Sequence, residues 1–205
     1  MSSPSLLDLR ARDLLDRLAS TDPTPGGGSA AALSGATAAA LVAMVCAMPK
    51  TRTGAPEERG RLDKALLEAR AASARLRSLV DEDSAAFEAV MAAYRMPKAT
   101  DDDKALRKKA IAGAMSHATA IPVQTAEACL AVVRAAAEAA QHGNANAVSD
   151  ARTAGALALA GILGAVENVR INATADDPAM KGLLEKAESA LREARTLTPT
   201  LGLTA

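Results

Sequence analysis

Residues 24–48 read TPGGGSAAALSGATAAALVAMVCAM, a proline and three glycines followed by an apolar stretch that contains no charged residue. The proline and glycines end any helix before them, and Ser29 is a residue type that caps the start of the next one. The stretch does not alternate as a strand would, so it predicts a helix from about Ser29 to Met48. Because that helix is apolar on every side, it is expected to be buried.

The same stretch is long enough to cross a lipid bilayer. However, Ala, Gly, Ser and Thr dominate it, no Trp or Tyr marks either end, and no Lys or Arg cluster precedes it. We therefore expect the central helix of a soluble bundle, where small side chains let neighbouring helices approach closely, and no membrane partner.

The remaining sequence also predicts helices. They cover about residues 5–19, 57–95 and a stretch from about 102 in which Pro122 should kink or restart the helix. QHGNANAVSD (141–150) precedes a further helix over 151–172, and an amphipathic helix follows ATADDP (173–178). No segment reads as a strand, a linker or an internal repeat. The fold expected is all-α, an up-and-down helical bundle with one long helix, as a single domain over residues 1–205.

Charge and composition disfavour several classes of partner. Lys plus Arg and Asp plus Glu each number 24, so no net field attracts nucleic acid or anionic lipid. Cys46 and Cys129 lie far apart in apolar runs, which indicates buried thiols in a reducing compartment. His117 and His142 stand alone, so no metal site is expected. The first residues lack the pattern of a signal peptide, and we expect a cytoplasmic protein.

An acid lies on the apolar face of the longest predicted helix. Steps of four and three residues define one stripe: Leu62, Leu66, Ala69, Ser73, Leu76, Val80, Asp83, Phe87, Val90 and Tyr94. A carboxylate between Val80 and Phe87 loses hydration unless it is hydrogen-bonded, paired or protonated. Two explanations stay open: a functional acid that faces a cleft, or a small rotation of the helix that returns Asp83 to water or lets it cap a neighbour.

The glycine segment has two explanations as well. Gly26, Gly28 and Ala31 match the loose dinucleotide pattern G-x-G-x-x-A, but no strand precedes them and no acid follows at the required distance. No Gly-Lys-Ser/Thr completes a phosphate-binding loop either. The amides of Gly27, Gly28 and Ser29 form a positive helix start that can bind an anion or carboxylate. Alternatively, the glycines make a tight turn that lets two backbones pass.

Amide side chains recur in two later segments. GNANAVSDA (143–151) places Asn146 and Asp150 on one face of a helix start, and ENVRIN (167–172) places Asn168 and Asn172 four residues apart on an otherwise apolar helix. Buried amides need hydrogen-bond partners. Simple capping and a frayed helix end would explain the same residues without a ligand.

Five segments in this order resemble the cyclodeaminase/cyclohydrolase family of folate enzymes: PTPGGGSAAALSGATAAALVAMVC (23–46), DEDSAAFEAVMAAYRMPK (81–98), IPVQ (121–124), GNANAVSDA and ENVRIN. The resemblance covers about residues 5–195. It implies a helical bundle that dimerises, a folate site near the subunit contact and no cofactor besides the tetrahydrofolate substrate. It also implies that one site is lined by Pro25, Gly26, Gly27, Gly28, Ser29, Asp83, Phe87, Asn144, Asn146, Asp150, Asn168 and Asn172.

The resemblance implies one of two related reactions. In 5,10-methenyltetrahydrofolate one carbon bridges N5 and N10 as a delocalised cation, so water needs only a positioned base, and Asp83 is the candidate for that general base and acid. The deaminase works through a similar carbon: N10 attacks a 5-formimino group and ammonia leaves. The stretches at 30–48 and 93–98 look closer to the stand-alone cyclohydrolases, which favours hydrolysis over cyclodeamination. A non-catalytic dimer that retains the fold is a further alternative.

The sequence departs from the family pattern after the apolar helix. Members commonly carry a Gly-Lys-Lys-Lys-Tyr-like or Gly-Arg-Arg-like segment there, whereas this chain has PKTRTGAPEERG (49–60) without a tyrosine. The resemblance implies that Lys50 and Arg52, the basic residues of this segment's first half, meet the glutamate carboxylates of the folate.

Overall fold

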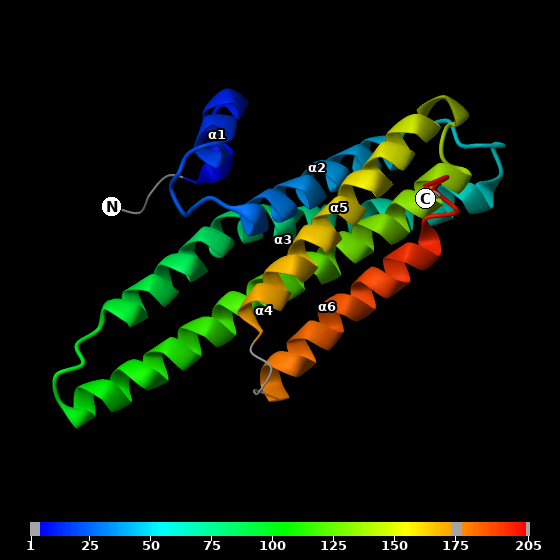
Figure 1. Cartoon of the computed structure of the whole chain (residues 1–205). Helices are drawn as coiled ribbons and strands as arrows, with labels where there is room; N and C mark the ends of the chain where they lie inside the picture. The colour runs from blue at the N-terminus through cyan, green and yellow to red at the C-terminus, as the bar shows by residue number, and fades with distance from the viewer. Residues whose placement is uncertain (1–4, 174–177, 204–205) are drawn as a thin grey trace.

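The computed structural model describes residues 5–173 and 178–203. Over these residues the chain forms two short 3₁₀ helices, η1 (Leu6–Asp8) and η2 (Ala145–Ala147), and no strand (Figure 1). The α-helices are α1 (Ala11–Leu18), α2 (Gly27–Ala47), α3 (Pro56–Arg95), α4 (Asp101–His142), α5 (Val148–Asn172) and α6 (Pro178–Leu197). The all-α expectation is confirmed.

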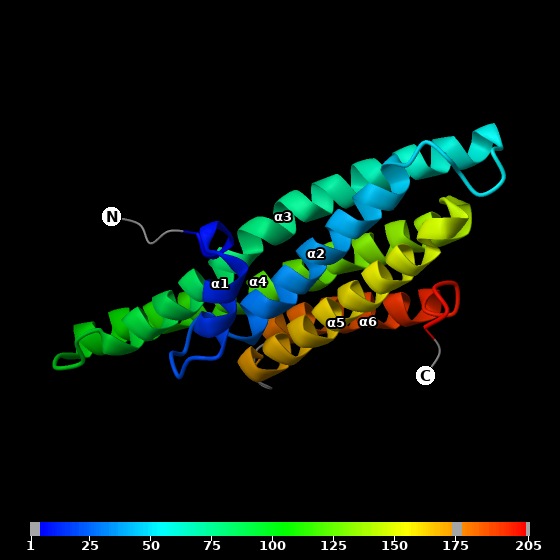
Figure 2. The same cartoon turned by 90° about the horizontal axis from the view of Figure 1, so that it is seen from above.

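Helices α2 to α5 form an up-and-down bundle, and α6 packs against α4 and α5 (Figures 1 and 2). The two longest helices, α3 and α4, continue past the beginning of α2 and the end of α5 as a two-helix extension (Figure 1). We call this extension, residues 84–115, the arm. Its position matters because the arm starts at the residue that follows Asp83.

Small side chains let the central helices approach one another. A Cβ atom on Gly35 of α2 would overlap the Sγ atom of Cys129 on α4, and one on Gly161 of α5 would lie 2.8 Å from the same sulfur. Cys46 and Cys129 are buried free thiols, as expected, and desolvation raises their pKa to about 11 and about 12. Glycine at these helix crossings therefore sets the spacing of α2, α4 and α5.

The expected first helix, residues 5–19, is interrupted. Leu9 and Arg10 are extended and separate η1 from α1. The reason is a contact with α3: the Ser5 hydroxyl and the Leu6 amide donate to the carboxylate of Asp81 at 2.6 and 2.8 Å. This long-range contact holds the chain in a direction that one continuous helix would not allow.

Pro122 does not restart α4, which runs through it as one helix. Proline has no amide hydrogen, so the carbonyl four residues earlier, that of Ala118, loses its usual helical donor. The side-chain amide of Asn172, at the end of α5, donates to that carbonyl at 3.2 Å. A side chain from another helix therefore replaces the missing backbone hydrogen bond.

The predicted stripe on α3 is buried only in part. Leu62, Leu76 and Val80 are buried, whereas Phe87 and Tyr94 are 38% and 48% exposed. The change occurs because α2 begins opposite Asp83, so the continuation of the stripe along the arm has no α2 over it. Phe87 and Tyr94 are therefore exposed, although they belong to the same stripe as the buried residues.

Three described helical segments are long and apolar enough to cross a membrane by length and composition alone: Gly27–Ala47, Asp101–His142 and Ala145–Asn172. In the bundle, 50%, 67% and 44% of the residues in their most apolar windows are buried. The other residues of these windows are half-buried or exposed within one chain.

Candidate functional site

Asp83 lies against the first turn of α2. The Ser29 hydroxyl donates to its Oδ2 atom at 3.0 Å, and the hydroxyl oxygens of Ser29 and Ser84 are 3.2 Å apart. A Cβ atom on Gly28 would overlap the carboxylate, so only glycine lets the backbone of α2 come this close. The positive end of the α2 dipole therefore faces an acid of the same chain.

Burial raises the pKa of Asp83, because desolvation outweighs the hydrogen bonds from the side chain and backbone of Ser29. The side chain is half-buried and not in bulk water. Asp83 thus caps α2, as one of the two explanations offered by the sequence allows, and it is at the same time desolvated. A half-buried carboxylate with a raised pKa is suited to accept and return protons.

Helix α5 brings Asn168 to the same end of the bundle. A Cβ atom on Gly27 would lie 3.6 Å from the Nδ2 atom of Asn168, and that amide donates to the carbonyl of Gly164 at 2.8 Å. Asn172 lies one turn further along α5, with its amide engaged at Ala118. The residues that gather here, which we call the acid site, are Gly27, Gly28, Ser29, Asp83, Ser84 and Asn168.

Two hollows adjoin the acid site along α3. The first has a volume of about 470 Å³, and its wall includes Thr24, Pro25, Ser84 and Glu88. The second, of about 720 Å³, shares Thr24, Ala85 and Glu88 with the first and continues past Phe87 to Arg95. Of the predicted substrate-binding residues outside the acid site, Pro25 and Phe87 therefore lie beside open space next to it, and Gly26 connects Pro25 to α2.

The remaining predicted residues lie at the other end of α2, a helix of 21 residues and so about 30 Å long. The Arg52 amide donates to the carbonyl of His142 at 2.8 Å, and its guanidinium donates to the carbonyl of Ala140 at 2.6 Å. Arg52 thus closes the end of α4. Within one chain it cannot reach the acid site, and neither can its exposed neighbour Lys50.

The loop that replaces the family's basic segment is organised around an acid. The Glu58 carboxylate accepts from the Thr51 hydroxyl at 2.7 Å and from the amides of Thr53 and Gly54 at 2.9 and 3.2 Å. These hydrogen bonds, led by that of the Thr53 amide, lower the pKa of Glu58 to about 2. The segment is therefore an ordered loop, although it lacks the family's cationic run.

The segment GNANAVSDA begins α5 at this same end. The Asn144 side chain accepts from the Asn146 amide at 3.0 Å and so caps η2. Asn146 is exposed and Asp150 half-buried. The predicted residues thus form two groups in a single chain: those around Asp83, and a distal group of Lys50, Arg52, Asn144, Asn146 and Asp150.

Residues 10–192 match the formiminotransferase-cyclodeaminase family. The chain belongs to this family. A similar curated protein is the methenyltetrahydrofolate cyclohydrolase of Methylorubrum extorquens, which is 41% identical over 89% of both chains. The formimidoyltransferase-cyclodeaminases of Rattus norvegicus and Sus scrofa are 34% and 35% identical over 94% of this chain, which corresponds to 36% of their own length.

A solved member of the formiminotransferase-cyclodeaminase family has the same fold. The crystal structure of formiminotetrahydrofolate cyclodeaminase from Thermotoga maritima superposes with a TM-score of 0.82 at 25% sequence identity. The match covers 96% of this chain and 95% of that one. The resemblance inferred from the five sequence segments is therefore confirmed at the level of family and fold.

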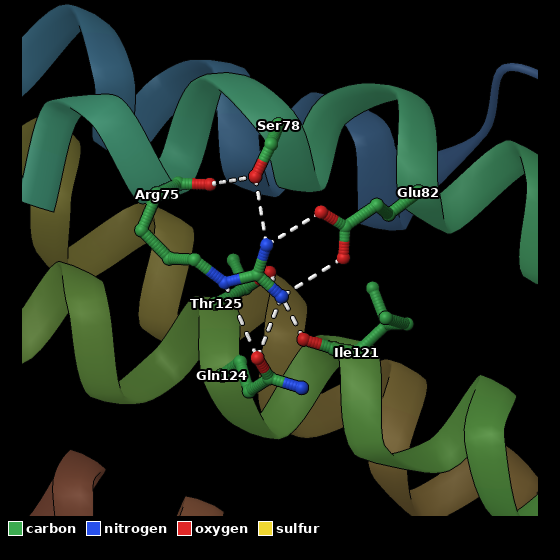
Figure 3. A network of polar contacts seen from close by, with 6 residues as sticks. All are labelled: Arg75, Ser78, Glu82, Ile121, Gln124 and Thr125. Carbon is green, nitrogen blue, oxygen red and sulfur yellow. Dashed lines mark hydrogen bonds and ion pairs between the residues drawn. The ribbon is translucent and has the colours of Figure 1, made fainter.

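Figure 3 shows an ion pair beside the acid site that the sequence did not predict. The Arg75 guanidinium binds the Glu82 carboxylate at 2.5 and 2.8 Å, and it donates to the Gln124 side chain at 2.6 and 3.2 Å. The hydrogen bond from Arg75 is the main cause of a lowered pKa at Glu82. Because Glu82 precedes Asp83 and Gln124 lies on α4, the network links α3 to α4 next to the acid. Gln124, which belongs to the IPVQ segment, was the one residue of this network that the sequence comparison with the family had marked.

Ser84 was missed as well. Its hydroxyl is close to that of Ser29, but a serine on a helix carries no sequence signal of such a contact. No group of three or more His, Cys, Asp or Glu within the described part of the chain is placed to hold a metal ion.

Proposed function

We propose that this protein is a folate one-carbon enzyme that hydrolyses 5,10-methenyltetrahydrofolate to 10-formyltetrahydrofolate. The observation that carries the proposal is the desolvated Asp83, held at the start of α2 beside a hollow. Identity of 41% with a methenyltetrahydrofolate cyclohydrolase, over 89% of both chains, supports this reaction. The substrate carbon is already electrophilic, so the reaction needs no cofactor.

Asp83 handles the protons of this reaction. It accepts a proton from the water whose oxygen adds to the methenyl carbon, which gives a neutral tetrahedral adduct. The bond from that carbon to N5 then breaks, the electron pair stays on N5, and the protonated Asp83 gives its proton to N5. The adduct hydroxyl loses its own proton to solvent as the formyl group forms, so one proton is released in each turnover.

The surroundings of Asp83 favour this role. A carboxylate in a partly desolvated site stabilises a nearby cationic carbon more strongly than it would in bulk water. The Ser29 hydroxyl, which is 2% exposed, orients the carboxylate from one side. The raised pKa keeps the group basic enough to take a proton from an attacking water.

The test is the decay of methenyltetrahydrofolate absorbance with purified protein. Wild type should exceed the buffer rate, and Asp83→Asn should lose roughly 10²–10⁴-fold in kcat, the usual contribution of a general base. Glu127→Gln, which removes an exposed acid of α4, is the matched control and should retain full activity. A wild-type rate equal to that of buffer would refute the proposed hydrolysis.

The second candidate is the cyclodeaminase reaction. The Thermotoga maritima neighbour carries that name and matches 96% of this chain, which favours the same acid acting on a formimino substrate. Release of ammonia from 5-formiminotetrahydrofolate without methenyltetrahydrofolate hydrolysis would select it. If neither substrate reacts, the chain is a non-catalytic helical protein that retains the fold.

We also propose a homodimer formed through the exposed face of α2 and α5. These helices lie side by side, and both face the viewer in Figure 2. Their exposed residues include a set without charge: Thr37, Ala40, Met44, Ala156, Ala160 and Leu163. Met44 and Leu163 are 42% and 40% exposed, and a second copy would remove both from water.

Twofold symmetry would also unite the two groups of predicted residues. The acid site lies at one end of the α2–α5 face and the distal group at the other. A twofold axis through the middle of this face would bring the distal group of one copy toward the acid site of the other. The proposal also includes a cytoplasmic location, which two buried free thiols support.

A further inference from the structure

The arm presents an uncovered face of α3 next to the acid site. Beyond Asp83, α3 continues to Arg95, about 18 Å along the helix axis, without α2 over it (Figure 1). Ser84, Glu88, Met91 and Arg95 recur on this part of the helix at steps of four and three, so they share one face. Phe87, the sole phenylalanine of the chain, is exposed beside them.

Two neighbouring hollows lie along this face and share part of their walls, and we call them together the track. The first begins at Ser84, whose hydroxyl is 3.2 Å from that of Ser29. The second overlaps it at Thr24, Ala85 and Glu88 and ends at Arg95. A molecule that places its reacting carbon at Asp83 therefore has open space along α3 as far as Arg95.

The charges along the track change sign. Near the acid site the first hollow is lined by Asp22, Asp81 and Glu88 together with one cation, Arg17. At its far end the track reaches Arg95, and beyond it Lys98, Lys104, Arg107 and Lys108 line a further hollow of about 330 Å³. Lys104 pairs with Asp101, but the other three lysine and arginine residues have no acidic partner among the described residues. Residues 95–109 hold six basic side chains and three acidic ones, Asp101, Asp102 and Asp103, so the arm tip is basic on balance.

A folate has the matching distribution of charge and shape. Its methenyl carbon is cationic, its p-aminobenzoyl ring is flat and apolar, and its glutamate ends in carboxylates. Asp83 and Glu88 suit the cation, Phe87 and Met91 suit the ring, and Arg95 suits the carboxylates. The Arg95 side chain is exposed and has no hydrogen bond or ion pair with any described residue, so its guanidinium is available to bind.

We infer that the track along α3 binds the p-aminobenzoylglutamate arm of the substrate, with Arg95 as the receptor for its carboxylates. This inference rests on the proposed folate activity. Arg95 also gives those carboxylates a binding site within one chain. Lys50 and Arg52 cannot do so, because they lie about 30 Å from the acid site and the guanidinium of Arg52 is hydrogen-bonded to the carbonyl of Ala140.

The test uses p-aminobenzoylglutamate itself, measured by calorimetry with the full-length protein and as a competitive inhibitor. Arg95→Met should weaken its binding about five- to tenfold, and should raise KM for methenyltetrahydrofolate to a similar extent with kcat unchanged. Arg95→Lys should recover part of the loss, because lysine keeps the charge without the planar fork. Binding of p-aminobenzoate, which lacks the glutamate, should not respond to either variant.

Arg77→Met is the matched control, since Arg77 is an exposed arginine of α3 that lines neither hollow. It should leave both affinities unchanged. The inference is wrong if p-aminobenzoylglutamate does not bind wild type, if Arg95→Met binds it as tightly as wild type does, or if Lys50→Met causes the loss instead. Calorimetry separates these outcomes from a failure of the proposed reaction, because binding of the fragment does not require turnover.

Discussion

Asp83 lies where a purely structural residue would be apolar. Its neighbours on the stripe, Val80 and Phe87, are hydrophobic, and a Cβ atom on Gly28 of α2 would overlap its carboxylate. Desolvation raises the pKa of Asp83, so the folded state binds its proton more tightly than the unfolded state does. Ionisation of this group therefore lowers the stability of the fold, a cost that a catalytic role would explain.

Because ionisation of Asp83 lowers the stability of the fold, Asp83→Asn gives a testable prediction. At pH 7 the variant should have a higher thermal midpoint than wild type, because the neutral amide keeps the shape and can still accept from Ser29. As the pH falls through the raised pKa, Asp83 becomes protonated in wild type and the difference should shrink. The measurement is thermal unfolding by circular dichroism across this pH range.

A lower midpoint for Asp83→Asn at pH 7 would contradict the argument. It would show that the ionised carboxylate stabilises α2 as a helix cap by more than its desolvation costs. Loss of activity combined with a gain in stability is the result that only a functional acid predicts.

At the scale of a helix, α4 is continuous because α5 supplies a missing hydrogen bond. Pro122 leaves the Ala118 carbonyl without its helical donor, and the Asn172 amide takes that place at 3.2 Å. The sequence indicated a kink or restart at Pro122, because the rule that proline disrupts a helix considers only neighbouring residues of the same helix. The partner that overrides the rule lies 54 residues away in the chain.

We predict that the effects of Asn172→Ala and Pro122→Ala on the free energy of unfolding are not additive. Asn172→Ala should destabilise the protein by about 1 kcal/mol, since it leaves the half-buried carbonyl of Ala118 without a donor. In a Pro122→Ala background the new backbone amide serves Ala118, so the same substitution should cost much less. Urea unfolding of the four proteins measures the difference, and equal costs in both backgrounds would refute the compensation.

At the scale of the whole molecule, α2 and α5 share an exposed face without charge that includes Met44 and Leu163. The proposed dimer would cover this face and would bring the distal group of one copy toward the acid site of the other. Leu163→Glu places a charge on that face, so it should shift the equilibrium from dimer to monomer by at least about tenfold. Sedimentation equilibrium measures the shift, and activity should fall as the dimer dissociates.

Leu67→Glu, at a leucine of α3 that is 67% exposed and outside the proposed face, is the control and should remain dimeric. Wild type that is monomeric at the concentrations where it is active would contradict the proposed arrangement. In that case the distal group would have no part in the reaction.

Several features of this protein followed from its sequence alone. The spacing of apolar residues and the absence of alternation predicted an all-α bundle, and the segment from Pro25 to Ser29 predicted where α2 begins to within two residues. The same spacing placed Asp83 on the inner stripe of α3. These features are readable because a helix is defined by contacts between residues three and four positions apart.

The tertiary structure decided how the helices are placed against one another. Only the packing shows that α2 begins opposite Asp83, which brings Ser29 into contact with the acid and leaves Phe87 and the rest of the arm without α2 over them. It also separates Lys50 and Asp150 from Asp83 in a single chain. The physical reason is that the register between helices depends on side chains far apart in sequence, here 54 residues for Ser29 and Asp83, and no local pattern encodes it.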